Sequence, residues 1–380
     1  MILNHPLAIL GLVLWISTAP VVELQTAAQS AASAPPIQER LNRVRADLFS
    51  AAPHVADDVK ELKEILGAEP RSVEAHVLLG MAYRALGTQE MLAEAVAEFR
   101  QTIELDGSFV PARFYLAHVY LDLGRASRAK EELLAALEKA PGNPQFTALL
   151  GEAERQLKNP ARAVELLRQA LQADASLVEA HYYLGLALFD AGQMPESIKE
   201  LELVAQSGAA RAEAYLALGT AYIEAARLDD AVAALMRGAK LDPAGAALRI
   251  QLARAYRLKG QLDKAELELT RARPKPNSTL AASYTEHQQL EFDLYTEQGL
   301  IKMKRGQYAA AAEAFKKVLA MDPNHGPTNN RLAEVYLRQG LFKLASEHAA
   351  RASKAGFPLP ESEQQLIRAG LAGKKPGVPE

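Results

Sequence analysis

Histidines and paired acids are the side chains of this sequence whose types could support chemistry. Eight histidines are present, which suit metal ligation or acid–base catalysis. None lies in an HExxH motif, and the sequence holds neither a nucleophile elbow nor a phosphate-binding glycine loop. Because the chain has no cysteine, thiol catalysis, disulfides and thiolate zinc sites are also excluded. The sequence therefore predicts no catalytic residue, no metal site and no cofactor, and a protein that is not an enzyme.

Two of the histidines stand at equivalent places in related segments. The letters VEAH run from 73 to 76 and again from 178 to 181, and each is followed by a Leu-Gly pair. His76 and His181 are thus the fourth residue of their segments, where Tyr215 and Tyr295 stand in two others, and we expect them to pack between helices. His118 falls at a position expected to face a groove, and both a binding role and a packing role stay open for it.

Acid pairs such as Asp57-Asp58, Glu131-Glu132 and Asp229-Asp230 fall at expected helix starts or on solvated faces. A carboxylate near a helix N-terminus interacts favourably with the helix dipole, so we interpret these pairs as structural. The triplet 277–279 (NST) matches a glycosylation acceptor, but a helix cap at Ser278 or Thr279 suits it better.

The segment that contains His76 recurs along the chain at a nearly fixed step. Eight units begin at 73, 110, 144, 178, 212, 246, 292 and 326. The four intervals from 110 to 246 and the interval from 292 to 326 are 34 residues long. The first interval is 37 residues, and a linker extends the interval from 246 to 292 to 46 residues. Seven of the eight units have leucine at their seventh position: Leu79, Leu116, Leu150, Leu184, Leu218, Leu252 and Leu332.

The spacing within each unit predicts two antiparallel helices. Leucine at position seven, a small residue at position eight and a large residue at position eleven lie on one helical stripe. The small residues let the two helices approach closely, and the large ones fill the space beside them. A glycine that suits the left-handed conformation ends the first helix: Gly87, Gly124, Gly192, Gly260, Gly306 and Gly340. One such hairpin cannot bury its own apolar faces, so stacking on neighbouring hairpins is expected.

This pattern resembles the tetratricopeptide repeat family over residues 71–356. The resemblance implies an all-α fold, a right-handed α-solenoid or superhelix of about eight stacked helix-turn-helix units. It also implies protein binding. In that family positions two, five, nine, twelve and thirteen of each first helix line an inner groove. Carried over, these positions predict a groove with apolar, aromatic and basic members: Phe114, His118, Leu121, Tyr182, Leu186, Phe189, Leu216, Ile223, Ile250, Arg254 and Arg257.

The groove residues favour one class of partner. Members of the family that capture chaperone tails resemble one another in a Lys/Asn clamp for a terminal carboxylate, and this sequence lacks that set. Apolar side chains that packing does not require indicate a binding surface, so we expect an apolar segment, such as an amphipathic helix, in the groove. The alternative is that the chain's own N-terminal helix, or tight superhelical coiling, covers these residues.

The N-terminus has the features of a targeting segment. Leu7 to Ile16 is a continuous apolar run with the length of a signal-peptide core, although Met1 to Pro6 contains no lysine or arginine. We expect residues 1–28 to be a signal peptide or membrane anchor, and the protein to be exported to the periplasm or cell envelope or held at the membrane. A buried or disordered N-terminal helix is the alternative interpretation. The net charge of −3 and the pI near 6.3 give no basic field for nucleic acid.

The remaining boundaries follow from the repeat. Residues 29–37 are expected to be a linker, 38–70 a degenerate N-terminal hairpin, and 71–276 units one to six. Residues 277–356 hold units seven and eight with an elongated first helix, and 357–380 a capping helix with a tail. The predicted function is a non-catalytic scaffold for a protein or peptide partner, with no nucleic acid, and with membrane contact only through the N-terminal segment. An accessory or regulatory subunit of an envelope enzyme or secretion complex is the alternative.

Overall fold

The computed structural model describes residues 35–50, 53–208, 210–272 and 284–373. Over these residues the chain is helical and contains no strand, so the predicted all-α solenoid of helix-turn-helix units is confirmed. The predicted targeting segment at 1–28, Ser278 and Thr279 lie outside the described residues. None of the helices in the described ranges is long and apolar enough to cross a membrane.

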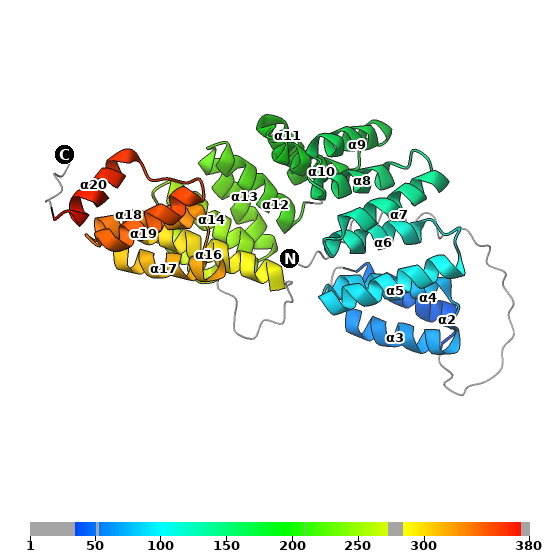
Figure 1. Cartoon of the computed structure of the whole chain (residues 1–380). Helices are drawn as coiled ribbons and strands as arrows, with labels where there is room; N and C mark the ends of the chain where they lie inside the picture. Colours follow the sequence, from blue (N-terminus) through cyan, green and yellow to red (C-terminus); the bar gives the residue numbers. More distant parts are fainter. Residues whose placement is uncertain (1–34, 51–52, 209, 273–283, 374–380) are drawn as a thin grey trace, which may run out of the picture. The chain divides into compact units, whose positions relative to one another are not determined.

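The chain divides between Ala210 and Arg211 into two compact units, which are described separately. Unit 1 contains five hairpins, in which each helix is followed directly by its partner (Figure 1). Its helices are α2 (Ile37–Leu48), α3 (Val55–Ala68), α4 (Val73–Leu86), α5 (Gln89–Leu105), α6 (Pro111–Asp122), α7 (Ala126–Lys139), α8 (Pro144–Gln156), α9 (Pro160–Ala173), α10 (Val178–Asp190) and α11 (Met194–Gln206).

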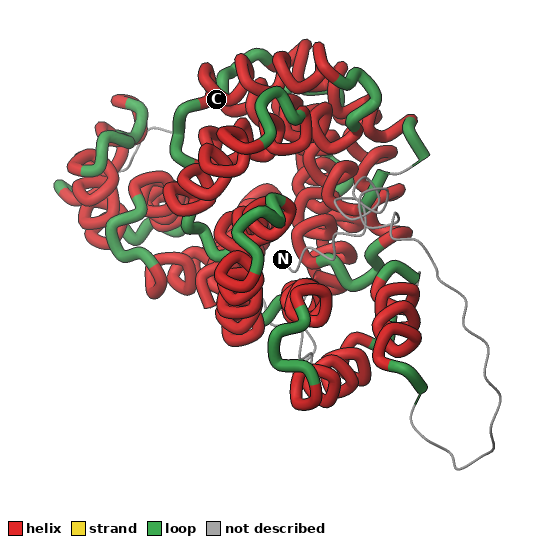
Figure 2. The backbone as a smooth tube through the Cα atoms, turned by 90° about the vertical axis from the view of Figure 1, so that its right-hand side faces the viewer, coloured by secondary structure: helices red, strands yellow, loops and turns green. Residues whose placement is uncertain are grey.

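Unit 2 continues the same design with four hairpins and a last single helix. The helices are α12 (Ala212–Glu224), α13 (Leu228–Leu241), α14 (Ala246–Leu258), α15 (Leu262–Ala272), α16 (Tyr284–Lys304), α17 (Tyr308–Met321), α18 (Gly326–Arg338), α19 (Phe342–Lys354) and α20 (Glu361–Leu371). Figure 2 shows helix-turn-helix pairs along the described backbone, with no strand among them. Buried Ile367 attaches α20 to α18 and α19, and so closes the end of the apolar core.

The close approach inside each hairpin depends on the small residue at position eight. A Cβ atom built on Gly151 in α8 would lie 2.6 Å from Cγ of Leu167 in α9, and Gly185 stands in the same relation to Leu201. Both leucines are completely buried. The glycine that ends the first helix adopts the left-handed conformation at Gly124 and Gly192, with φ of 67° and 74°.

Position four connects the first helix of several hairpins to the loop before it. His181 in α10 contacts a carboxylate oxygen of Glu200 in α11 at 2.6 Å through Nδ1, and its Nε2 donates to the carbonyl oxygen of Ala175 at 3.1 Å. His76 makes the same two kinds of contact with Glu98 and with a loop carbonyl. These histidines therefore have the packing role that the sequence predicts.

The first helices of consecutive hairpins form one continuous layer in each unit. In unit 1, α4, α6, α8 and α10 contact one another in turn, and in unit 2 α12, α14 and α16 do the same. We call the surface formed by the first helices the inner face of each unit. The residues predicted to line a groove lie on these helices.

Candidate partner-binding face

Three predicted groove residues on α6 are packed inside unit 1. Phe114, His118 and Leu121 are buried, and Phe114 is only 1% exposed. Its ring centroid lies 4.6 Å from the His118 ring and 5.4 Å from Phe146 on the neighbouring first helix. The structure thus differs here from the expected open groove, because adjacent first helices approach closely enough to cover position five of α6. These side chains stabilise the stack.

The predicted groove residues on α10 have a different environment. Tyr182, Leu186 and Phe189 are only half-buried, and they follow one another at intervals of four and three residues along one stripe of the helix. Tyr182 and Leu186 also contact the buried core of unit 1. We call these three residues the α10 stripe, and it is the part of the predicted groove in unit 1 that keeps accessible apolar surface.

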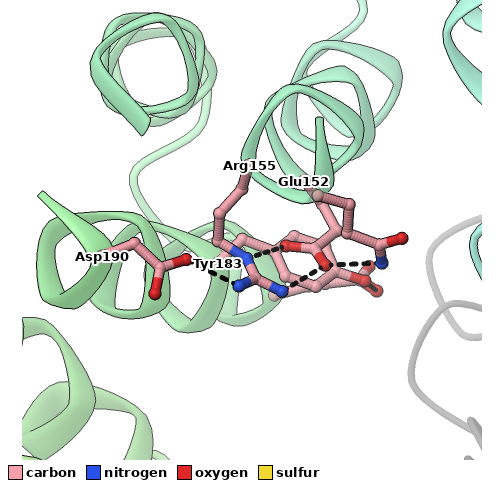
Figure 3. A network of polar contacts seen from close by, with 6 residues as sticks. Glu152, Arg155, Tyr183 and Asp190 are labelled. Atoms are coloured by element: carbon pink, nitrogen blue, oxygen red, sulfur yellow. Dashed lines mark hydrogen bonds and ion pairs between the residues drawn. The ribbon is translucent and has the colours of Figure 1, made fainter. Parts of the chain in front are cut away.

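A charged network connects α8 with α10, the helix that carries the stripe (Figure 3). Arg155 of α8 donates two hydrogen bonds to the carboxylate of Glu152, at 2.7 and 2.8 Å, and a third to Asp190 of α10 at 2.8 Å. Tyr183 donates to Glu179 at 2.9 Å. Burial raises the pKa of the Tyr183 phenol well above its usual value, so the phenol remains a hydrogen-bond donor.

A second pair of the same kind joins earlier first helices. Arg84 of α4 donates from Nε to Asp122 of α6 at 2.7 Å, and its Nη2 lies 3.5 Å from Nδ1 of His118. Burial lowers the pKa of Arg84, but the nearby Asp122 carboxylate outweighs this and the pKa is raised. Arg84 and Arg155 both stand at position twelve of their units. Their partners, Asp122 and Asp190, both stand at position thirteen of the following unit. Sequence reasoning missed these pairs, although that recurrent spacing was the signal that could have found them.

In unit 2 most of the residues predicted to line the groove are also buried. Ile223 and Ile250 are buried, and only Leu216 is half-buried among the three predicted aliphatic residues. Arg254, predicted to stand beside the groove, donates to Glu224 at 2.8 Å.

Arg257, the second arginine predicted at the groove, is buried and forms two hydrogen bonds with Glu297 of α16, at 2.6 and 3.1 Å. Arg254 and Arg257 therefore both form hydrogen bonds with acids of neighbouring first helices.

The described ranges contain no group of three or more His, Asp or Glu side chains that could hold a metal ion.

Comparisons with known proteins agree with the hairpin stack. Family models described as "Tetratricopeptide repeat" match residues 88–153 and 302–362, and residues 149–214 and 216–279. Together these segments cover well over half of the chain. The chain belongs to the tetratricopeptide repeat family. No curated protein matches it.

One solved structure shows the same fold over most of the chain. A chain from the APC/C hetero-tetramer Cut9-Hcn1 superposes with a TM-score of 0.68 at 15% identity, over 87% of this tetratricopeptide repeat chain. The match covers 62% of that chain. The tetratricopeptide protein TTC0263 from Thermus thermophilus is similar at 22% identity and a TM-score of 0.43, over 48% of this chain and 98% of its own length.

Tetratricopeptide arrays bind protein or peptide partners, and in this general sense the chain is a protein-interaction scaffold.

Proposed function

We propose that the scaffold binds an apolar face of a partner protein, in the form of an amphipathic helix, on the α10 stripe. The observation that carries this proposal is the partial exposure of Tyr182, Leu186 and Phe189 on a face whose other predicted groove residues in unit 1 are buried. Aromatic residues beside a fixed polar rim are enriched at protein interfaces. A partner helix would cover the stripe with residues at helical spacing.

The polar network gives this surface a defined edge. Arg155 is held by Glu152 on its own helix and by Asp190 at the end of α10, so the rim does not rearrange when a partner arrives. A partner helix with one apolar face and one polar face satisfies both parts of the surface. Such preorganisation reduces the entropy lost on binding.

We further propose that the protein acts in the cell envelope, exported or held at the membrane by residues 1–28. The support is the apolar run from Leu7 to Ile16, followed by small residues at 26–28. On this proposal the partner is an envelope protein, and the array assembles with it outside the cytoplasm.

The experiment is affinity purification from native cells of the full chain and of the double variant Leu186→Ser/Phe189→Ser, followed by mass spectrometry. Leu203→Ser is the matched control, because Leu203 lies on the second helix α11 and is 43% exposed. Circular dichroism establishes that all three proteins are equally helical. We expect the double variant to lose a partner that the control retains. Retention of every partner by the double variant, or equal loss in the control, would contradict the proposal.

A further inference from the structure

A basic hollow lies at the turns of two neighbouring hairpins in unit 1. The turn between α6 and α7 and the turn between α8 and α9 surround a cavity of about 560 Å³. Its lining contains four basic side chains and no acidic one: Arg125, Arg128, Arg155 and Lys158. The chain as a whole carries a net charge of −3, so this concentration of positive charge is local.

Three of the four cations face solvent. Arg155 is neutralised by Glu152 and Asp190. Arg125, Arg128 and Lys158 are exposed, and within the described part of the chain none of them forms an ion pair. Arg128 instead stacks over the Tyr120 ring, with its guanidinium carbon 5.9 Å from the ring centroid.

The other hairpins of the same chain show that the turn does not need these charges. Arg125 stands at position sixteen of its unit, where Gln193, Gln261 and Gln307 stand in three others. A fourth unit has Arg227 there, but Asp230 accepts from it at 2.7 Å.

The residue beside this position is a second departure from the pattern. Lys158 stands at position fifteen with a φ of 66°, whereas six other units have glycine in that left-handed conformation, Gly124 and Gly192 among them, and the remaining unit has the small Ala226. A side chain in this conformation is unfavourable compared with glycine. Lys158 therefore occupies a backbone conformation for which glycine would be more favourable.

We propose that this hollow binds an acidic segment of a protein, through several carboxylates that lie among Arg125, Arg128 and Lys158. Guanidinium groups bind carboxylates through paired hydrogen bonds, and the ammonium group of Lys158 adds a third positive charge. A cavity of about 560 Å³ is much larger than one inorganic anion needs, and its charge is spread over two turns. A run of acidic residues matches both the volume and the spread of charge. Arg155 lines this hollow and also belongs to the network beside α10, but Arg125, Arg128 and Lys158 do not. The proposal rests on these three residues and does not depend on the function proposed for the α10 stripe.

The test is fluorescence anisotropy of a short, labelled polyglutamate peptide with the full chain, at low salt and at about 0.15 M salt. We expect saturable binding that weakens as salt rises. The double variant Arg125→Gln/Lys158→Gly should bind at least roughly tenfold more weakly, a loss of about 1.4 kcal/mol, because it removes two of the three exposed positive charges. Both substitutions introduce residues that the chain already uses at these turn positions, so the Tm of the variant should equal or exceed that of the parent.

Arg227→Gln is the matched control, because it removes an arginine at the same turn position where an acid already pairs with it. Its peptide affinity should equal that of the parent chain. Absence of saturable peptide binding by the parent, or equal binding by the double variant, would overturn the proposal. Competition by inorganic phosphate at lower concentration than the peptide, or adsorption to anionic vesicles without peptide binding, would also overturn it in favour of a phosphate group.

Discussion

At the scale of single residues, the small position eight controls how closely two helices of a hairpin approach. A methyl group on Gly151 would meet the fully buried Leu167 side chain, whereas a methyl group on Gly67 in α3 would have no neighbouring atom within 4 Å. We expect Gly151→Ala to lower the free energy of unfolding by about 1–3 kcal/mol through overpacking.

Gly67→Ala is the matched change, since Gly67 is helical and exposed. It should raise the free energy of unfolding by about 0.4–1 kcal/mol, because alanine loses less backbone entropy in a helix. Urea denaturation followed by circular dichroism measures both effects. Equal changes in the two variants would show that the contact with Leu167 does not limit the hairpin.

Asp58 gives the N-terminal hairpin a pH-dependent stability. Burial, with the nearby Asp47 carboxylate, raises the pKa of Asp58 from 3.8 to about 7. The folded hairpin therefore favours the protonated carboxyl group. The stabilisation is complete below the unfolded pKa near 3.8 and is lost as the pH rises to about 7. Asp58→Asn should remove this dependence and slow hydrogen exchange in α2 and α3 at pH values above about 7.

The exposed neighbour Asp57 provides the control for that experiment. Hydrogen exchange measured by mass spectrometry at acidic and alkaline pH should show no comparable slowing for Asp57→Asn. A parent protein in which α2 and α3 exchange equally at both pH values, after correction for intrinsic rates, would contradict the assignment.

Single-residue burial on the inner face was the least predictable feature. The sequence places Phe114 and Tyr182 at the same position of their units, yet the first is buried and the second half-buried. Sequence position within a repeat fixes which face of a helix a side chain occupies. It does not fix how closely the neighbouring first helices approach, which depends on packing along the whole unit.

At the scale of elements, the long interval between units six and seven is bridged by charges. The sequence predicts an elongated first helix there, and the structure places it at α16, with 21 residues. Arg257 of α14 and Glu297 of α16 form the buried link. The interval of 46 residues in the sequence indicated an insertion. The pairing of Arg257 with Glu297 could not be predicted, because these residues are 40 positions apart and no local sequence pattern connects them.

We expect Arg257→Met to destabilise unit 2 by about 3–5 kcal/mol, since it leaves the Glu297 carboxylate buried without its cation. The double variant Arg257→Met/Glu297→Leu should recover most of that loss. Urea denaturation of the parent, Arg257→Met, Glu297→Leu and the double variant gives the coupling energy of the pair. A double variant as unstable as Arg257→Met would mean that the pair does not account for the effect.

The basic hollow also arises at the scale of elements. The chain's own repeats carried a usable signal, because Arg125 and Lys158 replace the glutamine and glycine of other units. The cavity itself could not be read from the sequence, since it forms between turns of two hairpins whose units begin 34 residues apart.

At the scale of the whole molecule, the repeat period predicted the class of fold and the general function. The helices, their order and the glycine-ended turns follow from the spacing of leucine, small residues and glycine over the eight units. The exposure of the side chains on the inner faces did not follow from the repeat, because charged pairs such as Arg84–Asp122 connect the first helices.

We expect residues 1–28 to direct the intact protein to the cell envelope. Cell fractionation should place the full chain in the envelope fraction, and N-terminal sequencing should show either removal of a segment ending near Ala28 or retention of Met1 in the membrane. Recovery of the intact chain in the cytoplasmic fraction would contradict export.

The most direct measurement of the central claim is site-specific photocrosslinking in native cells. A benzophenone amino acid replaces Leu186 on the α10 stripe in one variant, and Leu203 on α11 in another. The scaffold account predicts that the variant at Leu186 forms covalent adducts with a distinct partner protein and that the variant at Leu203 does not. Adducts that are absent at Leu186, or identical at both positions, would contradict it.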